Sequence, residues 1–451
     1  MSSITTVSDS VTVQDVGYSY DAVGNVTGID EVADGGSERY VTYAYDDLDR
    51  LASAVALDDQ SAEIYEETYA YDGLGNVSGR TVQIDSGTTA EYTYSYGGDA
   101  GTSYANPHAV TEITYDNDDV RELTYDENGN VLTDQVEDGY GTPYADTVRE
   151  YSWDWGSRLA QSAFDAGTTA YGYDASGRRV SADDGLADVR TPTGLWTETR
   201  DSATGVRTGI TKRLYANGRL IEESDNTGGS AARHFVHADH LGGTSVVTGL
   251  DGGIEQALDY YPYGEVRVDE QSGTFDERIK YAGHENDSGT GLIYMGARYY
   301  DPTLARFLSE DPLSRQNTET PLANPQLMNM YSYAANSPLR YNDPTGEGPV
   351  DTAGGYSYGL FEGLVAYGNA CMDTLQHPIA AAGNVIASFR TTGQFIREFA
   401  ADPSRVSSEI SSGLSVMAGE YDAMSDFDRG RAVGPAGEGI RQRSKPWPPR
   451  I

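Results

Sequence analysis

The residues whose types and spacing could support chemistry lie between positions 230 and 345. Three histidines and an aspartate, His234, His237, Asp239 and His240, fall within seven residues, and neutral imidazoles are good zinc ligands. No second ligand cluster accompanies them, so a metal site is the less favoured interpretation. We expect these four residues to brace a turn between strands, and we expect no metal and no cofactor.

Three Asp-Pro pairs follow, at Asp301-Pro302, Asp311-Pro312 and Asp343-Pro344. Proline fixes φ and removes a backbone donor, while aspartate bonds nearby backbone N–H groups. The first interpretation of all three pairs is therefore that they form turns.

A pattern of Tyr-x-Tyr-Asp-x-x-Gly-Asn-Val recurs along the first 180 residues and predicts the elements that position these groups. Clear copies are YSYDAVGNV (18–26), YAYDGLGNV (69–77) and LTYDENGNV (123–131); variants are YAYDDLDRL (43–51), YSWDWGSRL (151–159) and YGYDASGRRV (171–180). Each copy predicts a strand, a turn carrying Asp and Gly-Asn, and a second strand, which together make a β-hairpin. A lone hairpin cannot bury its face, so the copies are expected to join into one continuous sheet.

The composition agrees with a mainly β fold. The chain of 451 residues has 34 tyrosines and 52 glycines but only 9 phenylalanines. Aromatic residues suit pleated surfaces and glycine suits tight turns.

Charge and cysteine content exclude several classes of function. The formal net charge is −39, from 70 acidic and 31 basic residues. Such a surface repels phosphate backbones, so binding of nucleic acid through the main body is not expected. Cys371 is the only cysteine, so neither an internal disulfide nor a thiolate metal cluster can form.

The start of the chain lacks the basic and apolar stretches of a signal peptide, and no segment has 18 uninterrupted apolar residues. We therefore expect no transmembrane segment. Export by a dedicated machine, or as part of a longer protein, is expected to deliver the chain outside the cell or to its surface.

After Gly346 the composition changes. Apolar residues at helical spacing between Leu360 and Leu375, and again between Ile379 and Phe399, predict two or three amphipathic helices. The segment 347–451 has one histidine and one cysteine and none of the HxxE, HNH, CxxC or nucleophile-elbow patterns. We therefore expect no enzyme that depends on one of these motifs in this segment.

The tyrosine repeats, followed by the block GLIYMGARYYDPTLARFLSEDPL (291–313), resemble the YD-repeat or Rhs proteins, which include polymorphic toxins, C components of insecticidal toxin complexes and teneurins. The resemblance covers about Tyr18 to Gly346. It implies a hollow, spiral β-shell plugged by an Rhs-associated core. The implied domains are repeats at 1–230, the core at 231–346, and a variable helical tail at 347–451.

The resemblance also implies candidate catalytic residues. In self-cleaving relatives an Arg and two Asp act like an aspartyl protease on the chain's own junction. The matching positions are Arg298, Asp311 and Asp343, and the implied junction is Glu347-Gly348, where cleaving relatives usually have Leu in place of Glu347. Two carboxylates held close together in a poorly solvated interior cannot both ionise, so one keeps a proton while the other activates water.

The expected function is therefore a shell fragment that encapsulates or presents a C-terminal region. An intramolecular aspartyl protease is implied by the resemblance alone, and Glu347 at the junction leaves open whether the chain cleaves itself or acts only as a scaffold. Its expected partners are its own C-terminal segment or an effector, upstream toxin components, and an immunity protein. The alternative is a cell-surface adhesion or carbohydrate-binding module.

Overall fold

A computed structural model describes residues 3–8, 11–32, 38–84, 87–97, 106–116, 119–137, 147–164, 167–226, 231–312 and 325–351. The chain divides into two compact units, Met1–Gly359 and Leu360–Ile451. All described residues belong to the first unit, and the helices expected after Gly346 lie outside them. Within the described part of the chain, no helix is both long enough and apolar enough to cross a membrane.

One antiparallel sheet of 23 strands dominates the first unit, and each strand pairs with the next strand along the chain. The strands are β1 (Ser3–Ser8), β2 (Val11–Tyr20), β3 (Val26–Val32), β4 (Glu38–Tyr45), β5 (Leu51–Asp58), β6 (Glu63–Tyr71), β7 (Val77–Ile84), β8 (Thr88–Ser95), β9 (Glu112–Tyr115), β10 (Val120–Tyr125), β11 (Val131–Glu137), β12 (Thr147–Trp153), β13 (Leu159–Phe164), β14 (Gly167–Tyr173), β15 (Arg179–Asp183), β16 (Ala187–Thr193), β17 (Trp196–Asp201), β18 (Arg207–Ala216), β19 (Arg219–Asp225), β20 (Ala232–Ala238), β21 (Thr244–Thr248), β22 (Ile254–Tyr260) and β23 (Val266–Gln271).

The segment after β23 forms two small sheets. The first contains β24 (Glu285–Asp287), β25 (Leu292–Met295), β26 (Arg298–Asp301) and β27 (Arg306–Phe307); the second contains β28 (Tyr341–Asn342) and β29 (Val350–Asp351). Three short 3-10 helices lie in the same part of the chain, η2 (Tyr281–Gly283), η3 (Pro325–Met328) and η4 (Ala334–Asn336). We call residues 277–351 the core segment.

The repeat motif builds the hairpin turns, as the sequence predicts. In each copy one oxygen of the aspartate accepts the backbone N–H groups two and four residues later, at 2.8 to 3.1 Å. The other oxygen accepts a side chain four residues later, which is Asn76 for Asp72 and Arg50 for Asp46. The residue three positions after the aspartate has positive φ, 80° at Gly75 and 60° at Asp49. The variant copies therefore keep the same turn with different side chains.

The second aromatic residue of most repeats has a structural role that the motif alone does not reveal. In five of the six named copies it lies at a register shift next to the turn, and its side chain donates a hydrogen bond to a backbone carbonyl of a preceding strand or turn. Tyr96, which follows β8, makes the same kind of bond. The six bonds, of 2.6 to 2.8 Å, run from Tyr45 to Val26, Tyr71 to Leu51, Tyr96 to Val77, Tyr125 to Val110, Trp153 to Val131 and Tyr173 to Leu159. Tyrosine and tryptophan both have a polar donor and phenylalanine does not, which explains why phenylalanine is scarce.

This ladder of bonds predicts the effect of removing one hydroxyl. Tyr45→Phe is expected to lower the free energy of unfolding by about 1 kcal/mol, because the Val26 carbonyl loses its donor. Tyr151→Phe is the matched control, since the Tyr151 hydroxyl is buried without a hydrogen-bond partner and its loss should cost nothing. Urea denaturation of the two variants checks this, and equal destabilisation would contradict the role of the ladder.

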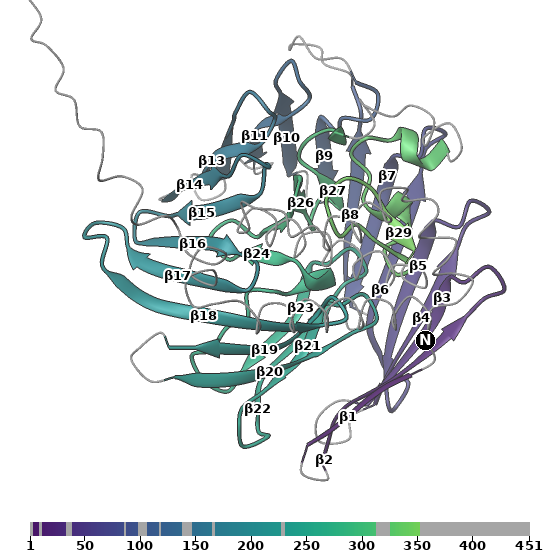
Figure 1. Cartoon of the computed structure of the whole chain (residues 1–451). Helices are drawn as coiled ribbons and strands as arrows, with labels where there is room; N and C mark the ends of the chain where they lie inside the picture. Colours follow the sequence, from purple (N-terminus) through teal and green to yellow (C-terminus); the bar gives the residue numbers. More distant parts are fainter. Residues whose placement is uncertain are drawn as a thin grey trace, which may run out of the picture. The chain divides into compact units, whose positions relative to one another are not determined.

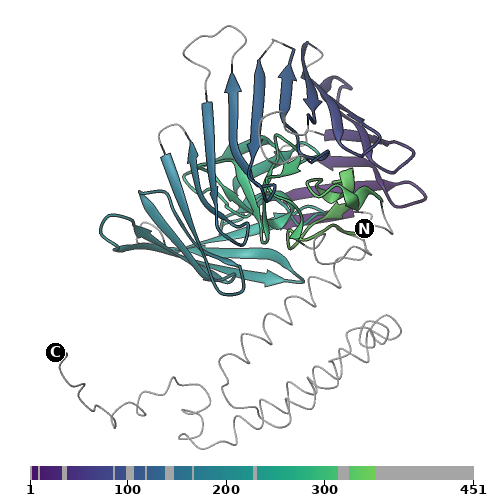
Figure 2. The same cartoon turned by 90° about the horizontal axis from the view of Figure 1, so that it is seen from above.

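The large sheet curves around the core segment, as Figures 1 and 2 show. Repeat tyrosines meet core tyrosines on its inner face: Tyr171 lies 5.3 Å from Tyr299, and Tyr125 lies 5.9 Å from Tyr331, between ring centres. Two hydrophobic clusters each combine strands of the sheet with residues of the core segment. Tyrosine is the commonest residue type among the buried hydrophobic residues that the structure describes, in agreement with the composition.

Several basic residues are buried. Among the residues that the structure describes, six arginines are buried, namely Arg80, Arg121, Arg179, Arg213, Arg298 and Arg306. Arg121 of β10 bonds Asp301 of β26 at 2.7 Å, and Arg179 of β15 bonds Asp287 of β24 at 2.6 Å. Buried ion pairs thus connect the sheet to the core segment.

The first and last thirds of the sheet meet through side chains. Arg39 of β4 pairs with Asp259 of β22, and the hydroxyls of Tyr71 and Tyr263 lie 3.0 Å apart. Among the described strands, β1 and β23 each pair on one side only. Side-chain contacts hold this seam together. No pairing between the described end strands contributes to it.

Candidate functional site

Arg298, Asp311 and Asp343 come from three parts of the core segment and meet in the folded chain. Arg298 begins β26, Asp311 follows β27, and Asp343 lies between β28 and β29. The Nη2 atom of Arg298 lies 3.0 Å from Oδ2 of Asp343 and 3.9 Å from Oδ2 of Asp311. The Asp343 side chain is 1% exposed and that of Asp311 is 17% exposed. The cluster therefore has one buried carboxylate and one that is partly accessible.

Several further contacts fix the guanidinium of Arg298. It donates to the backbone carbonyls of Gly346 and Met330, the latter at 3.0 Å. Its central carbon lies 3.5 Å from the centre of the Phe307 ring. These contacts satisfy the donors of a buried cation, so Arg298 places a fixed positive charge between the two carboxylates.

Asp343 lies in a turn of the same kind as those of the repeats. Its Oδ1 atom accepts the N–H of Glu347 at 3.1 Å, and Gly346 has a φ of 71°. The sequence YNDPTGE (341–347) is a degenerate copy of the repeat motif, with aspartate, glycine and the final residue at the same spacing. This signal was present in the sequence but the repeat analysis missed it.

The expected cleavage junction touches this turn. The nitrogen of the Glu347–Gly348 peptide bond is Gly348 N, which donates to Oδ2 of Asp343 at 3.0 Å. A carboxylate has about four lone-pair directions, and Asp343 uses three of them for Glu347, Gly348 and Arg298. The geometry leaves one direction for a water molecule or another donor.

A cavity of about 300 Å³ adjoins the cluster. Its lining includes Arg298 and both chain neighbours of Asp311, which are Glu310 and Pro312. Water can therefore approach the Asp311 side of the cluster.

Asp301, the remaining Asp-Pro aspartate, has a different role. Its Oδ1 atom accepts the N–H of Thr303 at 2.8 Å in the turn between β26 and β27, and its Oδ2 atom bonds Arg121. Although burial opposes it, the charges of Arg121 and Arg149 hold the pKa of Asp301 below its usual value. Asp301 thus forms a turn and anchors the core segment to the sheet.

The histidines of the sequence cluster have separate partners. His234 stacks on Phe275 with ring centres 3.7 Å apart, His237 bonds the Thr248 hydroxyl at 3.0 Å, and His240 bonds the Leu339 carbonyl at 2.9 Å. Asp239 accepts the N–H of Gly243 at 2.8 Å, as a repeat aspartate does. The structure therefore supports the structural interpretation of the cluster. In the part of the chain that the structure describes, no group of three or more His, Cys, Asp or Glu could hold a metal ion.

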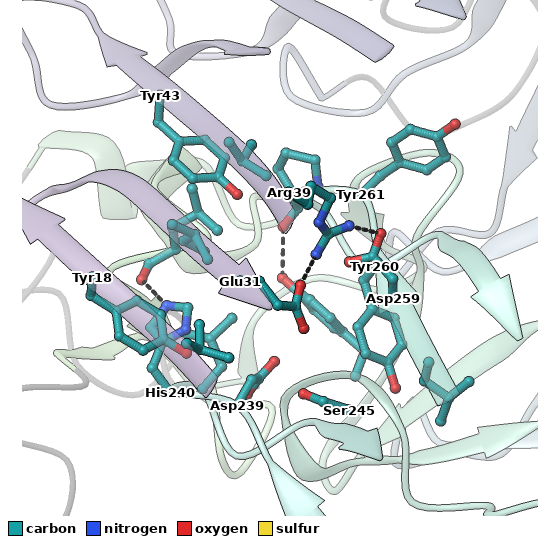
Figure 3. A pocket seen from close by; sticks show the side chains of 18 of the residues that line it. Tyr18, Glu31, Arg39, Tyr43, Asp239, His240, Ser245, Asp259, Tyr260 and Tyr261 are labelled. Atoms are coloured by element: carbon teal, nitrogen blue, oxygen red, sulfur yellow. Dashed lines mark hydrogen bonds and ion pairs between the residues drawn. The ribbon is translucent and has the colours of Figure 1, made fainter. Parts of the chain in front are cut away.

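A second, smaller cavity of about 70 Å³ lies at the seam of the sheet. Figure 3 shows Tyr18, Asp239 and His240 on one side of it and the Arg39–Asp259 pair on the other. Burial raises the pKa of Asp239 to about 6 and lowers that of His240 to about 4. At neutral pH the seam therefore holds an ionised Asp239 and a neutral His240.

The raised pKa of Asp239 predicts a pH effect on stability. The folded chain binds this proton more tightly than the unfolded chain, so its contribution favours folding at low pH and is lost as the pH rises toward 6. Between pH 4.5 and 7.5 the wild type should lose about 1 to 2 kcal/mol of unfolding free energy relative to Asp239→Asn. Urea denaturation at the two pH values measures this difference. An unchanged difference would show that Asp239 does not titrate in this range.

The fold and the site together define a class. A long meander of aspartate-turn hairpins curves around a tyrosine-rich core segment that holds a buried Arg–Asp cluster. This architecture is a YD-repeat β-shell.

Comparisons with known proteins found the following similarities. Residues 207–339 match the teneurin YD-shell family model. The toxin subunit YenC1 of Yersinia entomophaga is 27% identical over 440 residues, covering 85% of this chain and 40% of YenC1. The double-stranded DNA deaminase toxin A of Burkholderia cenocepacia is 27% identical over 405 residues, covering 81% of this chain and 24% of the toxin. The structure of the Photorhabdus luminescens Tc holotoxin pore is 17% identical and covers 77% of this chain and 21% of that one, with a TM-score of 0.38.

The chain is thus similar to YD-repeat proteins, a group in which the matches are toxin subunits, toxins and the teneurin shell. It spans less than half the length of either toxin relative.

Proposed function

We propose that the chain is a shell segment of an Rhs-type polymorphic toxin that encloses or presents a C-terminal region, and that it cleaves itself after Glu347. The match to toxin subunits and toxins supports the first part. The contact between Gly348 N and Asp343, beside Arg298, supports the second.

The proposed reaction is hydrolysis of the Glu347–Gly348 bond. Arg298 orients Asp343 through a charge-assisted bond, and Asp343 takes a proton from the attacking water. The water oxygen bonds the carbonyl carbon of Glu347, the bond from that carbon to Gly348 N breaks, and Asp343 passes the proton to the departing nitrogen. Asp311 keeps its own proton, because two close carboxylates cannot both ionise, and polarises the carbonyl oxygen.

Intact-mass measurement of the purified chain tests the reaction. The wild type is expected to yield the fragments 1–347 and 348–451, while Asp311→Asn and Asp343→Asn stay full length. Asp174→Asn is the matched control, because Asp174 forms the same kind of turn far from Arg298 in the sequence, and this variant should still cleave. Glu347→Leu should cleave faster, since a carboxylate at this position repels the dyad.

Two results would overturn the protease. One is cleavage that persists in both aspartate variants, and the other is a full-length product from both the wild type and Glu347→Leu. The shell function would survive either result, because it rests on the fold and the relatives.

The proposal extends to organisation and partners. The domains are the repeats at 1–230, the core at 231–346 and the tail at 347–451, with the tail or an attached effector as the cargo. Upstream toxin components and an immunity protein are the proposed partners, and export from the producing cell is the proposed route of action.

A further inference from the structure

Trp155 stands out when the repeats are compared with one another. It follows the turn aspartate Asp154, and the same position in the other copies holds small or polar residues, namely Ala22, Asp47, Gly73, Glu127 and Ala175. The turn itself needs only Asp154, the positive φ of 58° at Ser157, and Arg158. The Trp155 side chain is 94% exposed, so it adds nothing to the buried core. The guanidinium carbon of Arg158 in the same turn lies 6.0 Å from the centre of the Trp155 ring, which is the outer limit of a cation–π contact. Apart from this contact, folding does not explain the tryptophan.

Trp155 forms part of the wall of the 300 Å³ cavity beside Arg298. Two hairpin tips contribute this side of the cavity, with Asn128 from one turn and Trp155 and Ser157 from the next. The core segment contributes the other side, including Arg298 and Glu310. The cavity therefore combines an exposed aromatic ring, neutral polar groups and a carboxylate. Its volume suits the end of a long side chain.

The charges around this cavity favour a cation. Arg298 is paired with Asp343 at 3.0 Å, so its positive charge is already balanced. The positive charge of Arg158, which lies near Trp155, is balanced by Asp154 at 2.6 Å. Glu310, which accepts a hydrogen bond from the neutral amide of Asn106 at 2.8 Å, adds a negative charge to the wall. The whole chain carries a net charge of −39, which attracts basic partners and repels acidic ones.

We propose that this cavity, the Trp155 cavity, binds an arginine or lysine side chain of a partner peptide. The cation lies against the face of Trp155, which is the best aromatic partner for a cation, and forms an ion pair with Glu310. Asn128 and Ser157 supply polar contacts to the peptide backbone. The inference concerns binding alone and holds whether or not the chain cleaves itself.

Isothermal titration of the full chain with two short capped peptides tests this proposal. One peptide contains two arginines separated by glycines, and the other has glutamine in place of both arginines. The arginine peptide is expected to bind, and its affinity should fall as salt is raised from 50 to 500 mM, values chosen to bracket physiological screening. The glutamine peptide should bind at least about fivefold more weakly, as expected for the loss of a cation–π contact and an ion pair.

Variants identify the site. Trp155→Ala and Glu310→Gln should each weaken binding of the arginine peptide about fivefold or more. Leu186→Ala is the matched control, because Leu186 is also exposed, at 82%, and does not line the cavity. Circular dichroism checks that each variant is folded.

Three results would overturn the proposal. They are equal binding of the two peptides, unchanged binding by Trp155→Ala, and binding of maltose with no binding of the arginine peptide. The last result would identify the cavity as a saccharide site.

Discussion

Arg298→Met is expected to lower the free energy of unfolding by about 3 to 5 kcal/mol, because removing one partner of a buried ion pair leaves a buried charge uncompensated. Asp343, with a side chain only 1% exposed, loses its ion-pair partner. The carbonyls of Gly346 and Met330 lose a donor in the same substitution. The turn that carries the proposed junction should therefore separate from β26, and any self-cleavage should stop.

Denaturant unfolding and limited proteolysis measure the effect. Arg190→Met is the control, since Arg190 pairs with Asp188 at 2.7 Å but its side chain is 53% exposed, and an exposed pair contributes at most about 1 kcal/mol. If both variants lose the same unfolding free energy, burial does not strengthen the contribution of the Arg298 ion pairs to stability.

Arg121→Met is expected to lower the free energy of unfolding by about 3 kcal/mol and to loosen the core segment from the sheet. Arg121 donates to both oxygens of Asp134, at 2.6 Å each, and to Asp301 at 2.7 Å. Arg149 lies 3.5 Å from Asp134 and 3.7 Å from Asp301. In Arg121→Met, Arg149 still partly balances the charges of Asp134 and Asp301. The expected loss of unfolding free energy therefore lies at the lower end of the range for buried ion pairs.

The pH dependence distinguishes this ion pair from simple loss of packing. The pKa of Asp301 is held low in the folded chain, so its contribution to stability is present near neutral pH and is lost as the pH falls through the folded pKa. In Arg121→Met the pKa of Asp301 should rise, and the stability gap between variant and wild type should narrow in acid. Denaturant unfolding at pH 7 and pH 3 checks this. A gap that stays constant would favour a packing effect.

The local parts of the structure followed from the sequence. The repeat motif predicted the hairpins around Asp21, Asp46, Asp72 and Asp126, and the structure confirms each of them. The prediction works because the hydrogen bonds described above for each turn aspartate reach no further than four residues along the chain, so local spacing specifies the turn. The turns at Asp239 and Asp343 form by the same local hydrogen bonds. Their sequences lack the Tyr-x-Tyr pair of the repeat motif, so a search for that motif does not find them.

The candidate site depended on the resemblance and on tertiary structure. Arg298 and Asp343 are 45 residues apart, and their contact requires the turn at Gly346 to dock against the strand that Arg298 begins. The resemblance named both residues, whereas no spacing in this sequence predicts that their side chains meet. The structure places the Arg298 guanidinium 3.0 Å from the Asp343 carboxylate. The intact-mass experiment tests whether the two residues take part in cleavage.

The sequence by itself determined the mainly β class, the repeating hairpins and the tyrosine core, because these depend on alternation and on turns of a few residues. Only the tertiary structure decided that Arg121 pairs with Asp301 across 180 residues, that the seam joins β4 to β22, and that Trp155 faces a cavity. These contacts depend on the curvature of the whole sheet. That curvature is the sum of many small twists between strands, and no short stretch of sequence specifies it.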